Sequence, residues 1–391
     1  MADGTIRRRT VFYIEGYDPR GPQHYHRLYR DEAEKQARVN GLKLSVGPRR
    51  RIDGISHSWT VDSGLCQTDY RFLRYDDLMR ARWSRGTVAV LGDIARYTWA
   101  FLRRGVFLGM LRISWPTFIT SILAPGLVLA ALLLAALAGT MAGLVVSWPI
   151  AVAVAVLCFA GLVSLRPVIE PYFAGFWLGR ICAFIADQGS GLVPEMEARI
   201  DIFAQRIAEA VIANGADEVL VVGHSVGSHI GVSVSARVLE KIGGESRGFS
   251  FLTLGHTIPL LGLQPRAVAF RNDLSRVSGD PRVAWVDVSA AIDGACFPLT
   301  DPVWGSGLEQ ADPKHPSPKL VSARFPKLFS PASYTRLKRD FSRAHFQYLM
   351  AAELAGDYDY FLITAGDLTL AQRFQHLGSV AGFNRFRIGS R

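Results

Sequence analysis

The stretch DEVLVVGHSVGSHIGVSV, residues 217–234, runs from apolar residues through Gly-His-Ser-Val-Gly into a second apolar segment. The run VLVV predicts a buried strand, and the segment after the glycine-flanked turn predicts a helix. A G-x-S-x-G sequence between a strand and a helix places its serine on a sharp, strained turn at the carboxyl edge of a sheet. Ser225 is therefore a candidate nucleophile, and the alternative is a serine in a turn that serves packing alone.

The segments around this turn alternate between strand-like and helix-like patterns. Strands are predicted near residues 10–14, 218–222, 249–254 and 283–288, and helices over residues 195–214 and from the turn to about residue 242. Such alternation is typical of a mostly parallel sheet covered by helices on both faces. The sequence thus predicts an α/β fold.

Residues 219–227, with the alternation around them, resemble the nucleophile elbow of the α/β-hydrolase superfamily in its lipase and esterase branch. The resemblance extends over residues 10–80 and 190–390. It implies an α/β-hydrolase-like sheet and three catalytic residues in the chain order nucleophile, acid, histidine.

In that family the acid lies just beyond a later strand. The segment VAWVDVSAAIDGACF offers Asp287 within the strand and Asp293 in the loop after it. A loop residue can reach over the sheet edge to a histidine, whereas a strand residue points into a sheet face, so Asp293 is favoured. Asp287 is the second choice and Asp301 the third, and each could instead be a carboxylate that caps a turn.

The family order requires the histidine to follow the acid. His315, His345 and His376 satisfy this order. His345 is favoured because it is expected at the start of a helix, HFQYLMAAEL, from which its ring can lean over the sheet edge. His376 is the next choice. His224 lies beside the serine in sequence and is expected to pack, since it cannot easily turn its ring onto that hydroxyl.

Two backbone N–H groups are expected to form an oxyanion hole. One belongs to Val226, which follows the serine, and the resemblance implies a second at Gly16 or Tyr17, after an early strand. Glu15 stands where the family often carries a histidine.

Residues 118–165 contain no Asp, Glu, Lys, Arg or His. One helix of this length would rise roughly 70 Å, more than twice the ~30 Å thickness of a hydrocarbon core. Two transmembrane helices, residues 118–138 and 144–165, fit better, with a turn at the glycine-flanked segment 139–143. The alternative is a hairpin buried in a soluble core.

The flanks of this block predict its orientation. Arg103, Arg104 and Arg112 precede it and Arg166 and Arg180 follow it, so both ends are expected on the cytoplasmic side of the inner membrane. The chain divides into residues 1–92 and 188–391, which form the hydrolase domain, and a membrane insertion, residues 93–187. The shoulders 93–115 and 171–187 are either interfacial helices or helices that pack on the core.

Composition narrows the choice of partners. The 391 residues carry a formal net charge of +10, and scattered arginines without a nucleic-acid-binding motif favour anionic lipid headgroups over nucleic acid. The four cysteines form no C-x-x-C pair, and neither a metal nor a cofactor is predicted.

Together these features predict a membrane-anchored serine hydrolase that cleaves lipid-like esters or thioesters through an acyl-serine. The alternatives are an acyltransferase that uses the same serine and a catalytically silent membrane scaffold.

Overall fold

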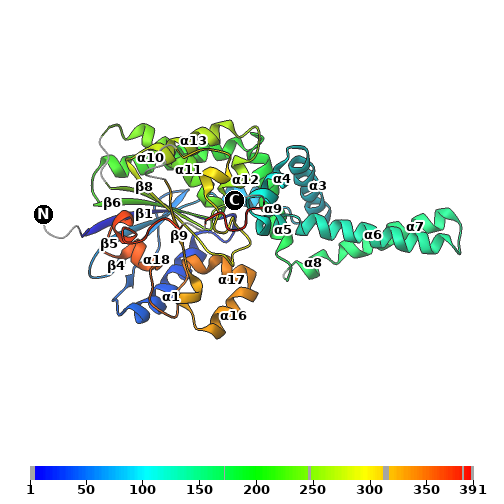
Figure 1. Ribbon diagram of the computed structural model, residues 1–391, viewed down its shortest axis with the longest axis horizontal. Coiled ribbons are helices and arrows are strands. Elements are labelled where there is room, and N and C mark those ends of the chain that lie inside the picture. Colours follow the sequence, from blue (N-terminus) through cyan, green and yellow to red (C-terminus); the bar gives the residue numbers. More distant parts are fainter. Residues whose placement is uncertain (1–4, 171, 245–247, 311–316, 381–382, 389–391) are drawn as a thin grey trace.

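The computed structural model describes residues 5–170, 172–244, 248–310, 317–380 and 383–388. Within these residues the protein has an α/β architecture with one nine-stranded sheet, which confirms the predicted fold class (Figure 1). The strands run in the order β2-β4-β5-β1-β6-β7-β8-β9, and β3 pairs with β4. Their bounds are Arg8–Ile14 (β1), Ser45–Val46 (β2), Arg50–Arg51 (β3), Ser56–Asp62 (β4), Gln67–Leu73 (β5), Glu218–His224 (β6), Phe249–Leu254 (β7), Val283–Ser289 (β8) and Lys319–Ser322 (β9).

The adjacent strands β5-β1-β6-β7-β8-β9 are all parallel to one another. β4 pairs with the outer side of β5 in the antiparallel direction. β6 is buried along its whole length, as expected for a central strand of a parallel sheet. β1 lies between β5 and β6 although it precedes both in the chain, so the strand order changes direction there. Ligands of α/β proteins commonly bind at such a switch point, outside the carboxyl ends of the strands.

Helices cover both faces of the sheet and form two hydrophobic cores. One core joins Phe12 and Ile14 of β1 to α10, α11 and α13, and the other joins Val11 and Tyr13 of β1 to α1 and short C-terminal helices. This division follows from the alternation of side chains along a strand. The bounds of these helices are Pro22–Asn40 (α1), Pro194–Ile212 (α10), Val226–Lys241 (α11), Val268–Gly279 (α13), Pro331–Arg339 (α16), Phe341–Phe346 (α17), Gln347–Leu349 (η1, a 3₁₀-helix), Tyr360–Ala365 (α18) and Leu370–Arg373 (α19).

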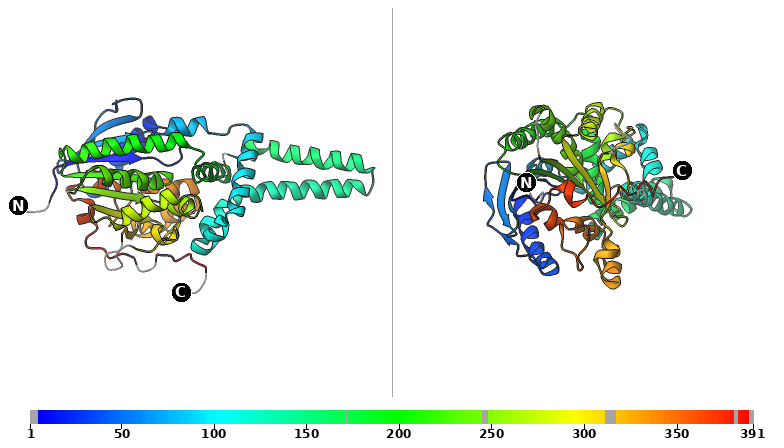
Figure 2. Two further views of the ribbon diagram at one scale, coloured as in Figure 1. Left: turned by 90° about the horizontal axis from the view of Figure 1, so that it is seen from above. Right: turned by 60° about the vertical axis from the view of Figure 1, so that its left-hand side comes forward.

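The predicted insertion corresponds to a run of helices between β5 and α10. Two of them, α6 and α7, pack against each other and project from the globular body as a hairpin (Figures 1 and 2). The run comprises Thr87–Arg103 (α3), Val106–Ile113 (α4), Trp115–Ser121 (α5), Leu123–Gly143 (α6), Trp148–Ser164 (α7), Arg166–Ile169 (α8) and Gly175–Gln188 (α9). The remaining helices are Asp76–Ala81 (α2), Ile258–Gly262 (α12), Pro302–Gly305 (α14) and Phe325–Leu328 (α15).

The two hairpin helices are long and apolar enough to cross a membrane. Their most apolar windows are 17% buried in α6 and 0% buried in the helix that continues α7 through Ile169. A hairpin buried in a soluble core would be enclosed by protein, so that alternative is wrong. Most of the apolar surface of both helices faces away from the protein.

The predicted position of the turn between these helices is wrong. Residues 139–143 continue α6, and the turn lies at residues 144–147. The first helix therefore lies closer to the C-terminus than the predicted 118–138, and the second begins later than the predicted 144–165 and ends at nearly the predicted residue. Gly139 does not break the helix, because it serves close packing: a Cβ there would lie 2.8 Å from the Cβ of Ala155. Small residues at helix contacts in membranes have this role.

The two shoulders of the hairpin differ. α9 is buried along most of its length and belongs to the core, as the packing alternative predicted for residues 171–187. α3 buries Ile94, Tyr97 and Phe101 but exposes Trp99 and Leu102, so its outer face keeps the character of an interfacial helix.

Candidate active site

Ser225 lies on the sharp turn between β6 and α11. Its φ of 55° and ψ of −121° fall in a region that residues other than glycine seldom adopt. The flanking glycines permit this turn: a Cβ on Gly223 would lie 2.5 Å from the carbonyl oxygen of Gly227, and a Cβ on Gly227 would lie 2.2 Å from that of Ile14. The motif therefore forms the strained strand-turn-helix geometry that a nucleophile elbow requires.

The Ser225 hydroxyl has no hydrogen-bond partner among the described residues. Its backbone N–H donates to the carbonyl of Leu254 at 2.9 Å, which fixes the turn, but its Oγ makes no hydrogen bond to a described residue. The residue is buried, with 3% of its surface exposed.

Asp293 and His345 form a buried pair. Nδ1 of His345 lies 2.9 Å from Oδ2 and 3.0 Å from Oδ1 of Asp293, 52 residues earlier in the chain. Burial raises the pKa of the Asp293 carboxyl, but the charge and hydrogen bond of His345 outweigh this, so that pKa lies below its usual value. An ionised Asp293 accepts the Nδ1–H and leaves Nε2 as the basic nitrogen of the ring.

The pair lies beside the elbow. The ring of His224, which precedes Ser225, is 4.8 Å from the ring of His345, and its Nε2–H donates to the His345 carbonyl at 3.1 Å. Burial lowers the pKa of His224 to about 3, so this ring packs against His345 without carrying a charge. His224 therefore packs as expected, and its contacts bring the Asp293–His345 pair to the nucleophile turn.

The predicted secondary structure around His345 is wrong, although its ring contacts Asp293 as expected. His345 lies near the end of α17, a six-residue helix, and not at the start of a long one. Asp340 caps α17 by accepting the N–H of Arg343 at 2.8 Å, and the chain leaves helical geometry at Met350 after one 3₁₀ turn. Apolar residues after His345, among them Phe346, Tyr348 and Leu349, are buried in the second hydrophobic core. Their spacing in the sequence resembles that of an amphipathic helix.

The backbone N–H groups of the loop after β1 and of the residue after Ser225 are the oxyanion-hole candidates. A Cβ on Gly16 would lie 3.0 Å from the Ser225 Cβ and 3.5 Å from its Oγ, so the loop after β1 lies directly against the nucleophile. The N–H groups of Gly16, Tyr17 and Val226 donate to no described residue. Because buried N–H groups are normally paired, these three are suited to bind an oxyanion.

The other carboxylates and histidines occupy separate places. Asp287 lies in β8, where it accepts a hydrogen bond from Thr253, and burial raises its pKa well above the usual value. Asp301 caps α14, as a turn carboxylate does. His376 is exposed and lies 3.4 Å from Asp357, and His315 lies outside the described residues. Of the residues weighed for these roles, Asp293 and His345 are the two that the structure joins.

Sequence reasoning missed three residues of this site. A Cβ on Gly255, whose φ is +50°, would lie 2.9 Å from Oδ2 of Asp293, so only glycine fits there. Tyr348 accepts the N–H of Ala290 at 2.9 Å on the loop that carries the acid. The ring of Trp177, on α9, lies 5.8 Å from that of His345. A glycine directly after a buried strand, at the sheet edge, was a signal for Gly255.

Within the described part of the chain, no group of three His, Cys, Asp or Glu side chains is arranged to hold a metal ion.

No family model, curated protein or solved structure matches the chain.

Proposed function

We propose that the protein is a membrane-anchored serine hydrolase with an α/β-hydrolase fold, acting on carboxylic esters or thioesters. The observation that carries the proposal is the buried Asp293–His345 pair beside Ser225, which is held in strained geometry between β6 and α11. A strained serine on a strand-to-helix turn, followed in the chain by a carboxylate and then a histidine, supplies the parts of an acyl-transfer site.

In the proposed reaction, Oγ of Ser225 attacks the carbonyl carbon while Nε2 of His345 takes the hydroxyl proton. Asp293 accepts the Nδ1–H of His345, holds the ring in the required tautomer and stabilises the imidazolium. The N–H of Val226, with that of Gly16 or Tyr17, stabilises the oxyanion. His345 then returns the proton to the leaving group, and water, deprotonated by the same ring, releases the acid from the acyl-serine.

The strand order supports the fold assignment. The elbow follows the central strand β6, the candidate oxyanion loop follows its neighbour β1, and the acid follows β8, two strands away on the other side. All three loops lie at the carboxyl edge of the parallel strands, where catalytic residues of α/β proteins gather.

The exposed hairpin supports the membrane assignment. Its helices expose leucine and valine side chains around much of their circumference, which is costly in water and favourable in a bilayer. Arginines lie at the base of the hairpin and the turn carries no ionisable residue, which by the positive-inside rule favours a cytoplasmic position for the globular body.

A fluorophosphonate probe, which phosphonylates activated serines, tests the nucleophile. Wild type is expected to be labelled, and Ser225→Ala is expected to lose labelling and to lose esterase activity by about 10⁴-fold or more. Ser235→Ala is a matched control, because its buried Oγ on α11 has no hydrogen-bond partner in the part of the chain that the structure describes. Labelling that persists in Ser225→Ala would contradict the assignment, and a folded wild type that reacts with no probe would favour a silent scaffold.

A further inference from the structure

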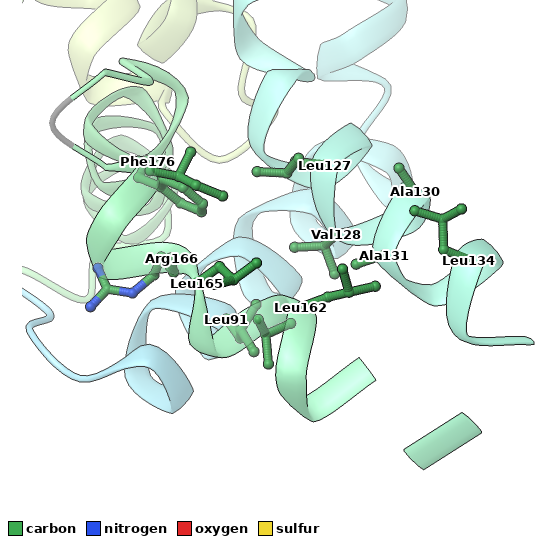
Figure 3. Close-up of a pocket in the computed structure, with 12 residues that line it drawn as sticks. Leu91, Leu127, Val128, Ala130, Ala131, Leu134, Leu162, Leu165, Arg166 and Phe176 are labelled. Carbon is green, nitrogen blue, oxygen red and sulfur yellow. The ribbon is translucent and has the colours of Figure 1, made fainter. Parts of the chain in front are cut away.

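A groove lies where the hairpin joins the globular body. We call it the hairpin groove. Figure 3 shows side chains from α6, from α7 and α8, and from α9 around it. Its lining includes Leu127, Val128, Ala131, Leu162, Leu165 and Phe176.

The lining of the hairpin groove is apolar. Its one ionisable residue, Arg166, is occupied elsewhere: the guanidinium forms an ion pair with Glu170 and donates to the carbonyl of Arg85 at 2.8 Å. Figure 3 shows its nitrogen atoms turned away from Val128 and Leu162. A polar ligand would find no partner there, because a buried polar group without a hydrogen bond costs free energy.

The groove is continuous with the exposed apolar surface of the hairpin. Leu134, which also lines it, is 54% exposed, and the neighbouring Leu133 is 62% exposed. In the proposed bilayer this surface is covered by hydrocarbon chains, so the chemistry adjacent to the groove is that of a lipid acyl chain.

One helix connects the groove to the candidate active site. Phe176 and Trp177 are neighbours in the first turn of α9, and Phe176 lines the groove. The ring of Trp177 contacts that of His345, and its Nε1–H donates to the carbonyl of Tyr17 at 3.2 Å, beside the candidate oxyanion hole. A ligand in the groove is therefore separated from the reacting residues by the first turn of a single helix.

We propose that the hairpin groove binds an acyl chain of a bilayer lipid, whose ester reaches Ser225 laterally from the membrane past Phe176 and Trp177. This inference rests on the proposed hydrolase function and adds to it the substrate class and the route. The bilayer lipid, and not an ester dissolved in water, is the natural substrate.

Filling the groove tests its role in substrate choice. Ala131→Trp places a large ring among Val128, Leu162 and Phe176 without touching the catalytic residues, and Leu132→Trp, on the exposed side of α6, is the matched control. In reconstituted vesicles, Ala131→Trp is expected to lower kcat/KM for p-nitrophenyl palmitate about tenfold, about 1.4 kcal/mol, and to leave p-nitrophenyl acetate unchanged. Leu132→Trp should change neither. Equal rates on palmitate for all three proteins would overturn the inference.

A second measurement separates this inference from the proposed function. A phosphatidylcholine with a photoactivatable diazirine near the end of one chain is cross-linked to the Ser225→Ala variant in vesicles, where no turnover is needed. Cross-links concentrated at Leu127, Leu162 and Phe176, and abolished by Ala131→Trp, support the groove even if wild type hydrolyses no ester. Cross-links spread evenly over the hairpin, or a groove closed by a second copy of the chain, would overturn the inference while esterase activity remained.

Discussion

At the scale of single residues, Glu15 has the most unusual environment near the site. It is fully buried immediately before Gly16, and neither of its carboxylate oxygens has a hydrogen-bond partner among the described residues. Burial raises its pKa well above the usual value, and the nearby charges of Asp18 and Asp76 raise it further, against the lowering effect of Arg74 and Arg80. Burial therefore favours the neutral form of this side chain, at the start of the loop that lies against Ser225.

This environment predicts a dependence of stability on pH. A carboxyl whose pKa is higher in the folded than in the unfolded state contributes fully to stability below the unfolded value, near 4.3, and this contribution is lost as pH rises toward the folded value. Glu15→Gln cannot ionise, so its free energy of unfolding is expected to rise relative to wild type between pH 5 and pH 8. Urea unfolding at both pH values measures this difference.

The control for Glu15 is Glu209→Gln, which replaces an exposed glutamate on α10. It should leave the pH dependence of wild type unchanged. A pH dependence that is the same in Glu15→Gln and wild type would show that the buried acid does not govern it.

Parts of the candidate site could be predicted from sequence, because they depend on a local turn motif or on the order of residues along the chain. Ser225 follows from a turn motif with its strand and helix, and Asp293 follows from its position in the loop after a strand. The Asp293–His345 hydrogen bond that the assignment requires is present, although the catalytic roles remain predictions. Trp177 and Tyr348 reach the site only through tertiary packing, which no local pattern encodes.

At the scale of elements, α5 connects the hairpin to the loop that carries the acid. The Thr117 hydroxyl donates to the carbonyl of Cys296 at 2.6 Å, and that of Thr120 donates to the carbonyl of Gly294 at 2.7 Å. Both carbonyls lie within three residues of Asp293. The position of the acid is thus coupled to the helix that leads into the hairpin.

Removing one of these bonds is expected to weaken the acid loop. Thr117→Val keeps the shape of the side chain but leaves the buried Cys296 carbonyl without its donor, which should cost about 1–3 kcal/mol of unfolding free energy. Esterase activity should fall as the Asp293–His345 pair loosens. Unfolding in urea and initial rates measure the two effects.

Thr335→Val is the control, because Thr335 is exposed on α16 and bonds only within its own helix. Its effect on stability should stay within about 0.5 kcal/mol. Equal stability and activity of Thr117→Val and wild type would show that α5 does not hold the loop.

The errors of prediction also arise at the scale of elements. Glycine usually marks turns, so the sequence predicts a helix break at Gly139, yet this residue lies at the contact between two helices, where small size matters. The segment after His345 has the spacing of a helix but continues as a 3₁₀ turn and extended chain. In both cases packing between distant segments decided the local structure.

At the scale of the whole molecule, the carboxyl edge of the sheet faces the hairpin, so the candidate site lies on the side nearest the proposed bilayer (Figures 1 and 2). The arginines at this end differ in their exposure to solvent. Arg166 and Arg180 are buried in ion pairs with Glu170, whereas Arg103 and Arg112 are exposed. Of these four residues, Arg103 and Arg112 are therefore the ones expected to contact anionic headgroups.

A charge in the middle of α6 tests the membrane assignment. Leu133 is 62% exposed at the centre of the helix, and Leu133→Arg should cost about 2.5–3.5 kcal/mol of insertion free energy. The fraction of protein retained in membranes after alkaline extraction is expected to fall. Leu354→Arg replaces a leucine of similar exposure in the globular body and should leave retention unchanged. Full retention of Leu133→Arg would contradict the transmembrane assignment.

The shortness of the turn between α6 and α7 bears on how the chain enters a bilayer during biogenesis. Only residues 144–147, Leu-Val-Val-Ser, separate the two helices, and they include no ionisable side chain. In the proposed transmembrane topology, the far side of the membrane receives neither a domain nor a charged side chain, and the translocation barrier is limited to the peptide groups of one tight loop. In this proposed topology we expect the two helices to enter the bilayer together as a hairpin, because only the short turn has to cross it.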